Sequence, residues 1–175
     1  PPATTASYPR ALHAVFRARA GSTPTAMHGE SYEGITEMRP GVFVFFDLDQ
    51  LSRQACTSDD LALSVIGTVI AHNRHTGQIV TDTGALALSK DISANARWPD
   101  TGYGAVCDVH TLEPIEGLHV AKVSQEHGIV PVSDPAAYDR LPIGTKLRIL
   151  PNHACITASA YTQARKSTRL NSSHI

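Results

Sequence analysis

The chain has 175 residues, with 15 Lys and Arg residues against 16 Asp and Glu residues and a formal net charge of −1. Its 42% hydrophobic and 18% charged residues are the composition of a globular protein that buries a core, not of a disordered one. The balanced charge offers no basic surface to nucleic acid or an anionic membrane, and the longest apolar run, residues 61–71, is far shorter than the ~20 residues of a spanning helix.

The three cysteines, Cys56, Cys107 and Cys155, are an odd number and include no CxxC pair. They form a poor disulfide framework and favour a reducing compartment, in which the thiols are available for packing or for a metal. The first residues lack the basic leader and apolar segment of a signal peptide. We therefore expect a cytoplasmic protein and, because the chain begins at Pro1 rather than Met, a piece of a longer one.

Residues 9–20 have apolar side chains at helical spacing and predict a short amphipathic helix, followed by a turn rich in Gly, Ser and Pro at 21–25. Residues 42–46, VFVFF, are β-branched and aromatic and predict a buried strand. Residues 61–71 are rich in Val, Ile and Thr and favour a long strand covered on both faces, although periodicity alone leaves a buried helix open.

Further short strands are predicted between clusters of Gly, Pro, Asp and Asn. These strands are residues 78–81, 105–109, 119–124 and 146–150, the last continuing through 155–158. The intervening turns are residues 73–77, 98–104, 113–117 and 133–144. Many short strands separated by turn signals are typical of an all-β barrel or sandwich, so the predicted fold class is mainly β.

The sharpest local motif is PNHACIT at residues 151–157. His153 and Cys155 are at i and i+2, and in an extended segment such side chains project from the same face. Imidazole nitrogen and thiolate sulfur are both good Zn²⁺ ligands, and two protein ligands leave positions open for water or substrate. The alternative is a buried thiol beside a polar loop histidine.

A second motif is GSTPT at residues 21–25, which offers backbone N–H groups and hydroxyls in a tight turn. A phosphate monoester needs such a cradle of small residues, and the alternative is an ordinary loop. His127, in QEHG, follows a predicted strand and precedes a glycine. Catalytic side chains occur at such places, and so do plain turns.

These motifs occur in a particular order: GSTPTA, GITEMRPGVFVFFD, DDLALSVIGTVIA, TDTGALALSKD, GYG, VSQEHG and PNHACIT. Through them, residues 21–160 resemble the C-terminal part of the D-threonine aldolase/D-serine dehydratase family, pyridoxal-phosphate enzymes related in fold to alanine racemase. The resemblance implies that residues 1–33 end an N-terminal α/β barrel that holds the cofactor. It implies a β-barrel domain at residues 34–165, and residues 166–175 are expected to be disordered or foreign to the domain.

By the same resemblance, Gly21, Ser22 and Thr23 match the family's phosphate-binding turn, and His153 and Cys155 match its H-x-C or H-x-D metal pair. Tyr103 and His127 are expected to line the site as catalytic residues. The family's Schiff-base lysine lies upstream of Pro1, so the isolated chain is expected to be inactive.

The resemblance implies a homodimeric lyase that acts on a small D-3-hydroxy amino acid. Pyridoxal 5′-phosphate would be the electron sink, and Zn²⁺ or another divalent metal would be the Lewis acid for the 3-hydroxyl group. The thiolate ligand favours Zn²⁺ and a D-serine dehydratase-like elimination of water. Two alternatives stay open, namely retro-aldol cleavage of the D-threonine aldolase type and a non-catalytic metal-binding or dimerising module.

Overall fold

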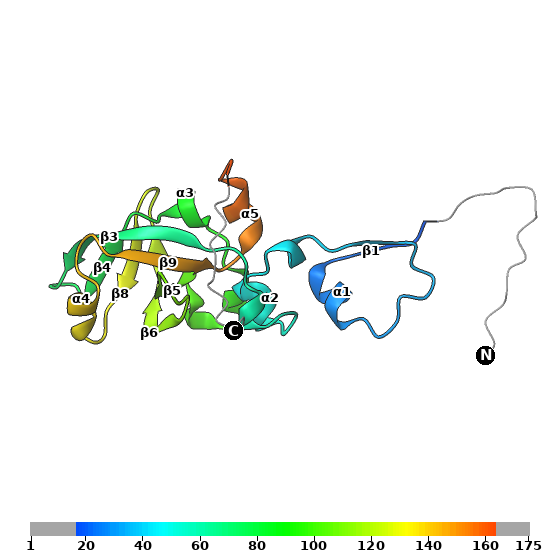
Figure 1. Cartoon of the computed structure of the whole chain (residues 1–175), viewed down its shortest axis with the longest axis horizontal. Helices are drawn as coiled ribbons and strands as arrows, with labels where there is room; N and C mark the ends of the chain where they lie inside the picture. The colour runs from blue at the N-terminus through cyan, green and yellow to red at the C-terminus, as the bar shows by residue number, and fades with distance from the viewer. Residues whose placement is uncertain (1–16, 164–175) are drawn as a thin grey trace, which may run out of the picture.

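The computed structural model describes residues 17–163, and their main feature is one seven-stranded sheet (Figure 1). Its strand order is β6-β5-β9-β3-β4-β8-β7, and every neighbouring pair is antiparallel. The strands are β3 (Val65–Asn73), β4 (Gln78–Thr81), β5 (Gly104–Asp108), β6 (Pro114–His119), β7 (Lys122–Val123), β8 (Gly128–Pro131) and β9 (Lys146–Pro151). The prediction of a mainly β fold is confirmed.

The two outer strands of this sheet, β6 and β7, are consecutive in the chain and are joined by Val120 and Ala121. The N–H of Val120 donates to Gly104 O of β5 (2.9 Å), and the N–H of Ala121 donates to Ile129 O of β8 (2.9 Å). The sheet therefore curves until its two ends are linked by a short connection. Because β6 and β7 do not pair with each other in the described residues, the predicted barrel is not a closed one.

Short helices cover the sheet and its ends (Figure 1). The α-helices here are α2 (Leu48–Ser52), α3 (Ala85–Leu88), α4 (Ala136–Arg140) and α5 (Ala154–Ser159), and 3₁₀ turns are formed by Val42–Val44, Ser58–Asp60, Ser93–Ala96 and Pro99–Thr101. None of the helices in residues 17–163 has the length and apolar character needed to cross a bilayer.

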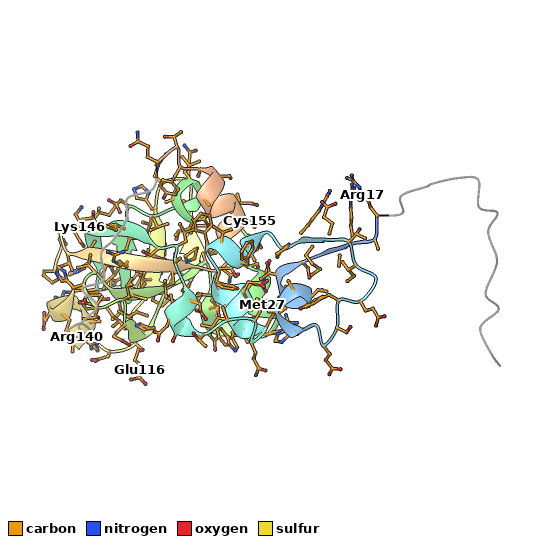
Figure 2. All side chains as sticks on the ribbon, turned by 45° about the vertical axis from the view of Figure 1, so that its right-hand side comes forward. Arg17, Met27, Glu116, Arg140, Lys146 and Cys155 are labelled. Carbon is orange, nitrogen blue, oxygen red and sulfur yellow. The ribbon has the colours of Figure 1, made fainter. Side chains whose placement is uncertain are left out.

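A separate unit at residues 17–39 projects from the sheet as an arm, with Arg17 at its far end and Met27 on its helix (Figures 1 and 2). In it, β1 (Arg19–Gly21) and β2 (Glu37–Arg39) pair in parallel, and α1 (Thr23–His28) connects them. The predicted helix at 9–20 is wrong for Arg19 and Ala20, which belong to β1, and residues 9–16 lie outside the described part.

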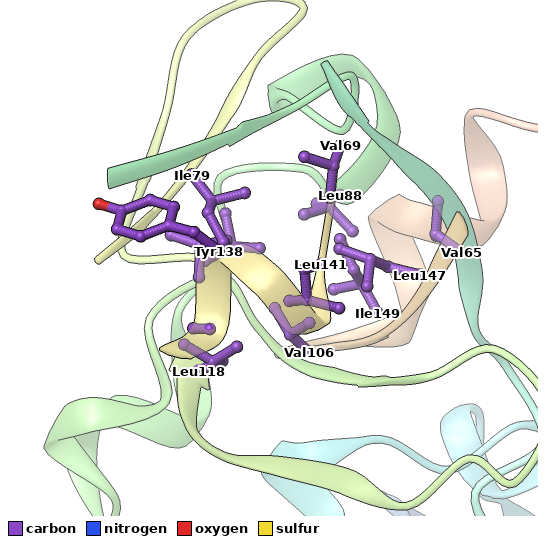
Figure 3. Close-up of a cluster of buried hydrophobic side chains, with 13 residues drawn as sticks. Val65, Val69, Ile79, Leu88, Val106, Leu118, Tyr138, Leu141, Leu147 and Ile149 are labelled. Carbon is purple, nitrogen blue, oxygen red and sulfur yellow. The ribbon is translucent and has the colours of Figure 1, made fainter. Parts of the chain in front are cut away.

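The main core lies within the curved sheet, and α3 and α4 supply part of it (Figure 3). Val69, Ile79, Val106 and Ile149 are at most 1% exposed, and each buried side chain of this kind contributes about 1.5–3 kcal/mol to stability. A second cluster of Leu48, Ala94, Cys107 and Leu150 lies on the other face of β5 and β9. It packs α2 against the sheet and so determines where the residues at the start of α2 lie.

Three predicted strands differ from the structure. Residues 42–44 form a 3₁₀ turn, in which Val42 is buried while Phe43 and Val44 are 46% and 60% exposed. The apolar run is therefore not part of a sheet. The strand predicted to continue to residue 158 ends at Pro151, and α5 follows. The strand in 61–71 is confirmed as β3, but Ile66 and Ile70 on its outer face are 56% and 38% exposed, so it is covered on one face only.

Two strands of the seven-stranded sheet lie outside the predicted ones, apart from His119 at the end of β6. β6 begins at Pro114 within a segment predicted as a turn, and Gly117 lies in its interior. An outer strand tolerates both residues because one side of its backbone has no neighbour to bond. β8 begins at the glycine of QEHG and is only four residues long.

Candidate metal and phosphate site

The motif that contains His153 and Cys155 lies at the junction between β9 and α5. His153 has extended backbone dihedral angles (φ −137°, ψ 129°) at the N-cap of α5, and Cys155 lies in the first helical turn. The shared direction of the two side chains is therefore set by a strand-to-helix junction, not by strand alternation as the sequence predicted. His153 is half-buried and Cys155 is exposed.

Asn152, directly before His153, is fully buried and bonded on every side. Its Nδ2 donates to Asn95 Oδ1 (2.6 Å) and to Gly102 O (2.7 Å), and its Oδ1 accepts from Ala94 N–H (2.9 Å). Its own N–H donates to Tyr103 O, and its carbonyl accepts from Asp49 N–H (3.0 Å). These bonds fix the backbone position from which His153 projects.

Asp47 lies behind His153 and is 2% exposed. As the N-cap of α2, its Oδ1 accepts from Gln50 N–H (2.8 Å), and its Oδ2 accepts from Ala154 N–H (2.8 Å). The same Oδ2 lies 2.8 Å from His153 Nδ1. This contact has the distance of an ion pair but lacks the angle of a well-aligned hydrogen bond, since Nδ1 has no hydrogen-bond partner.

The carboxylates around the site shift the ionisation of both predicted ligands. Asp47, with smaller effects of Asp91 and Asp49, raises the pKa of His153 against the opposing effect of burial. Burial, followed by the charges of Asp47 and Asp91, raises the pKa of the Cys155 thiol. The local field is therefore negative, which favours a cation.

Asp49 is a second buried acid beside His153. Its Oδ2 accepts from Arg53 Nε (2.9 Å) and from Gln50 Nε2 (3.2 Å), whereas its Oδ1 has no partner. One ligand atom from each of Asp47, Asp49 and His153 lies within 4.8 Å of the others. Asp49 Oδ1 is therefore a buried anionic oxygen that is free to bind a cation.

The predicted phosphate turn joins β1 to α1. Ser22 is the N-cap of α1 with φ 80°, a left-handed conformation that a non-glycine residue adopts at a cost of about 1–3 kcal/mol. Its Oγ accepts from Thr25 N–H (3.3 Å). Thr23 is 2% exposed and its Oγ1 has no partner. Gly21, the last residue of β1, is exposed.

A cavity of about 370 Å³ brings the two motifs together. Ser22 and Thr23 line one part of it, and His153 and Cys155 line another, although about 130 residues separate the motifs in sequence. Asp49, Gln50 and Arg53 also line this cavity, whereas Asp47 does not. The folded chain thus brings the predicted phosphate turn and the predicted metal pair to one cavity.

Tyr103 and His127, the two residues expected to line the site, are not in this cavity. Tyr103 packs against the main core, and only its carbonyl reaches the site, through Asn152. His127 is exposed in the turn between β7 and β8, where its carbonyl accepts from Ser124 N–H (2.9 Å). Their catalytic role stays a prediction.

Sequence reasoning missed Asp47 and Asp49. Their signal is the pair of acids at i and i+2 directly after the apolar run 42–46, a spacing that gives one helix cap and one residue in the first helical turn. Nothing in the sequence connects them to His153, which lies more than 100 residues further along the chain.

Comparison with known proteins identifies the family. Residues 62–165 match the family model described as "Putative serine dehydratase domain". The chain is 43% identical over 145 residues to D-threo-3-hydroxyaspartate dehydratase of Delftia sp., an alignment that covers 81% of this chain and 38% of that protein. It is 30% identical over 130 residues to D-serine dehydratase of Saccharomyces cerevisiae, covering 71% of this chain and 29% of the yeast protein.

Solved structures agree with this relationship. An alanine racemase-like protein of Idiomarina loihiensis superposes with a TM-score of 0.78 at 41% identity, covering 83% of this chain and 39% of that one. The Delftia dehydratase superposes with a TM-score of 0.76 at 41% identity, covering 82% and 38%. Its solved variants include a histidine-to-alanine substitution and, two positions later, a cysteine-to-alanine substitution in the metal-free form.

The chain therefore spans less than two fifths of the length of these relatives. Within that span the matches to the family model, to curated dehydratases and to their structures all agree. The chain belongs to the family defined by the serine dehydratase domain.

Proposed function

We propose that the chain is part of a pyridoxal-phosphate- and metal-dependent dehydratase that removes water from a D-3-hydroxy amino acid to give a keto acid and ammonia. The observation that carries this proposal is the single cavity lined by both Ser22–Thr23 and His153–Cys155. The dehydratase relatives support elimination over retro-aldol cleavage.

The residues on one side of the cavity fit a divalent metal. His153 and Cys155 supply nitrogen and sulfur, and Asp49 Oδ1 is a buried oxygen without a partner. A buried carboxylate oxygen is costly when unpaired, and a cation would remove that cost while lowering the raised pKa of the Cys155 thiol. When bound, the metal supplies a Lewis acid for the substrate 3-hydroxyl group.

The residues on the other side fit the phosphate of pyridoxal phosphate, which when bound supplies an electron sink. Thr23 Oγ1 is buried, unpartnered and in the cavity wall, so it has a hydrogen bond to offer. Ser22 and Thr23 follow the carboxyl end of β1 in a β1-α1-β2 unit with parallel strands, the place where α/β folds bind phosphate. We propose that residues 17–39 are the end of the α/β barrel expected for residues 1–33.

The chain's own residues thus have separable roles. Ser22 and Thr23 hold the phosphate, and His153 and Cys155 hold the metal. Arg53 Nε holds Asp49 Oδ2, so that Oδ1 keeps its place at the cavity. Asn152 sets the position of His153 by its bonds to Ala94, Asn95 and Gly102.

A chimaera tests the function, because the chain covers only 38% of its Delftia relative. In it, residues 17–163 replace the matching segment of the Delftia dehydratase. We expect the chimaera to release a keto acid from D-threo-3-hydroxyaspartate or D-serine and to lose this activity with Cys155→Ala or after chelation, while the absorbance of bound pyridoxal phosphate remains.

Two outcomes would contradict the proposal. Release of glycine and an aldehyde would show an aldolase instead. A chimaera that folds, binds stoichiometric zinc and yet shows no turnover, while the unmodified Delftia enzyme is active in the same assay, would favour a non-catalytic metal-binding module.

A further inference from the structure

We infer that Asp47 is a positioning residue that holds the His153 ring by Nδ1, so that Nε2 is the nitrogen presented to a metal in the cavity. This inference rests on the proposed metal site at His153 and Cys155. It concerns a carboxylate that does not line the cavity and that sequence reasoning did not select.

The first support is that Asp47 is itself rigidly held. Its side chain is fully buried, and both oxygens accept backbone N–H bonds of 2.8 Å, one from Gln50 in α2 and one from Ala154 in α5. Asp49 N–H also donates to Asn152 O (3.0 Å), so the starts of α2 and α5 are joined on both sides of the carboxylate. A group held in this way can fix the orientation of a ring that touches it.

The second support is which ring atom faces Asp47. His153 Nδ1 lies 2.8 Å from Asp47 Oδ2, while His153 lines the cavity and Asp47 does not. The imidazole therefore has the carboxylate on its Nδ1 side and the cavity on another. Metal-bound histidines commonly donate their second N–H to a carboxylate, which fixes the tautomer and makes the ligating nitrogen more basic.

The rival arrangement has Asp47 and Nδ1 as ligands of the same metal ion. Three observations oppose it: Asp47 is 2% exposed, its Oδ2 is already bonded to Ala154 N–H, and it lies outside the cavity wall. Asp49 has the free oxygen and does line the cavity. Asp47 thus acts on the metal through His153, and Asp49 is the acid that can reach it.

The test measures zinc affinity by competition with a chromophoric chelator, on the 175-residue chain and its variants. Asp47→Asn keeps an oxygen to accept from Gln50 N–H but places an amide group against His153. We expect zinc to bind about 10- to 100-fold more weakly, the usual effect of removing such a partner. Asp108→Asn is the matched control. Asp108 also accepts two backbone N–H bonds of 2.8 Å but lies at the end of β5, outside the cavity, so this variant should bind zinc as the parent does.

A second measurement does not depend on how well Asp47→Asn folds. In the unsubstituted chain labelled with ¹⁵N-histidine, long-range ¹H–¹⁵N spectra report which nitrogen of His153 binds zinc, and His153→Gln identifies the signal among the nine histidines. We expect zinc on Nε2 and a proton on Nδ1. Zinc on Nδ1 would overturn the inference.

Failure of this inference and failure of the proposed function give different results. If the parent chain binds zinc, loses it with His153→Ala, and Asp47→Asn binds it equally well, Asp47 has no positioning role and the metal site remains. If His153→Ala and Cys155→Ala leave zinc binding unchanged, the proposed site is wrong and the inference fails with it.

Discussion

The side chain of Asn152 joins residues 94–95 and Gly102 to the end of β9, and Asn152→Ala removes all of these bonds at once. Three hydrogen bonds are lost, each with a net contribution of about 1 kcal/mol. Because Asn152 is 0% exposed, water does not replace them, and the Ala94 N–H left without a partner costs about a further 1–3 kcal/mol. The expected loss is about 4–6 kcal/mol, a large share of the roughly 5–15 kcal/mol that stabilises a domain.

The assay is urea unfolding of the parent chain and the variant, followed by circular dichroism and by the fluorescence of Trp98. This tryptophan reports on the same region, since its backbone N–H donates to Ala94 O (2.9 Å). The control is Asn73→Ala, whose side chain accepts one bond of 3.3 Å from Thr76 N–H in an exposed turn. It should cost less than about 0.5 kcal/mol. If Asn152→Ala costs no more than Asn73→Ala, Asn152 does not hold the site together.

Three further predictions concern thiols, the phosphate turn and pH. Alkylation followed by peptide mass spectrometry should label exposed Cys155 first. It should label Cys107 last, because this thiol is buried and its pKa is raised to about 11, mainly by burial. Zinc should protect Cys155, and labelling of Cys155 that zinc does not change would oppose a metal there. Thr23→Val removes an unpartnered buried hydroxyl, so it should leave the free energy of unfolding unchanged or raise it by about 1 kcal/mol. The same substitution should weaken the binding of pyridoxal phosphate by the chimaera, and unchanged binding would exclude Thr23 from the phosphate site. The backbone N–H groups of Thr111 and His110 lower the pKa of Asp108 in the folded state below its ordinary value of 3.8. The parent should therefore be more stable than Asp108→Asn at pH values above 3.8, and this difference should disappear as the pH falls through the lowered pKa. A difference in stability that grows on acidification would contradict the prediction.

The sequence predicted the central strands β5, β9, β3 and β4 of the sheet, but it missed β8, which also has a neighbour on each side. β4 was predicted with its bounds and β5 within one residue at each end, because their short apolar runs lie between clear turn signals. The start of β9 was predicted at Lys146, but the predicted strand continued to residue 158, past its end at Pro151. β6 was missed, since an outer strand can contain the Pro114 and Gly117 that normally indicate a turn. The strand predicted for residues 42–46 was wrong because this run has the composition of a buried strand although Phe43 and Val44 are exposed.

The site shows the same division between local and long-range information. The chemistry of His153, Cys155, Ser22 and Thr23 could be proposed from local motifs, and the structure places all four around one cavity. The helical position of Cys155 could not be predicted, because α5 depends on Asp47 accepting the N–H of Ala154, more than 100 residues away. For the same reason, neither Asp47 nor Asp49 could be connected to His153 before folding.

The parallel pair β1–β2 has a consequence for handling the isolated polypeptide. Within residues 17–163 each of these strands has a neighbour on one side only, so each presents an unsatisfied row of peptide groups to solvent. Such rows recruit strands from other molecules. The outer edges of β1 and β2 are not brought together by a short connection of the kind that Val120 and Ala121 form between the ends of the larger sheet. Self-association on overexpression should therefore begin at residues 19–21 and 37–39, and removing these residues should improve the solubility of the remaining domain.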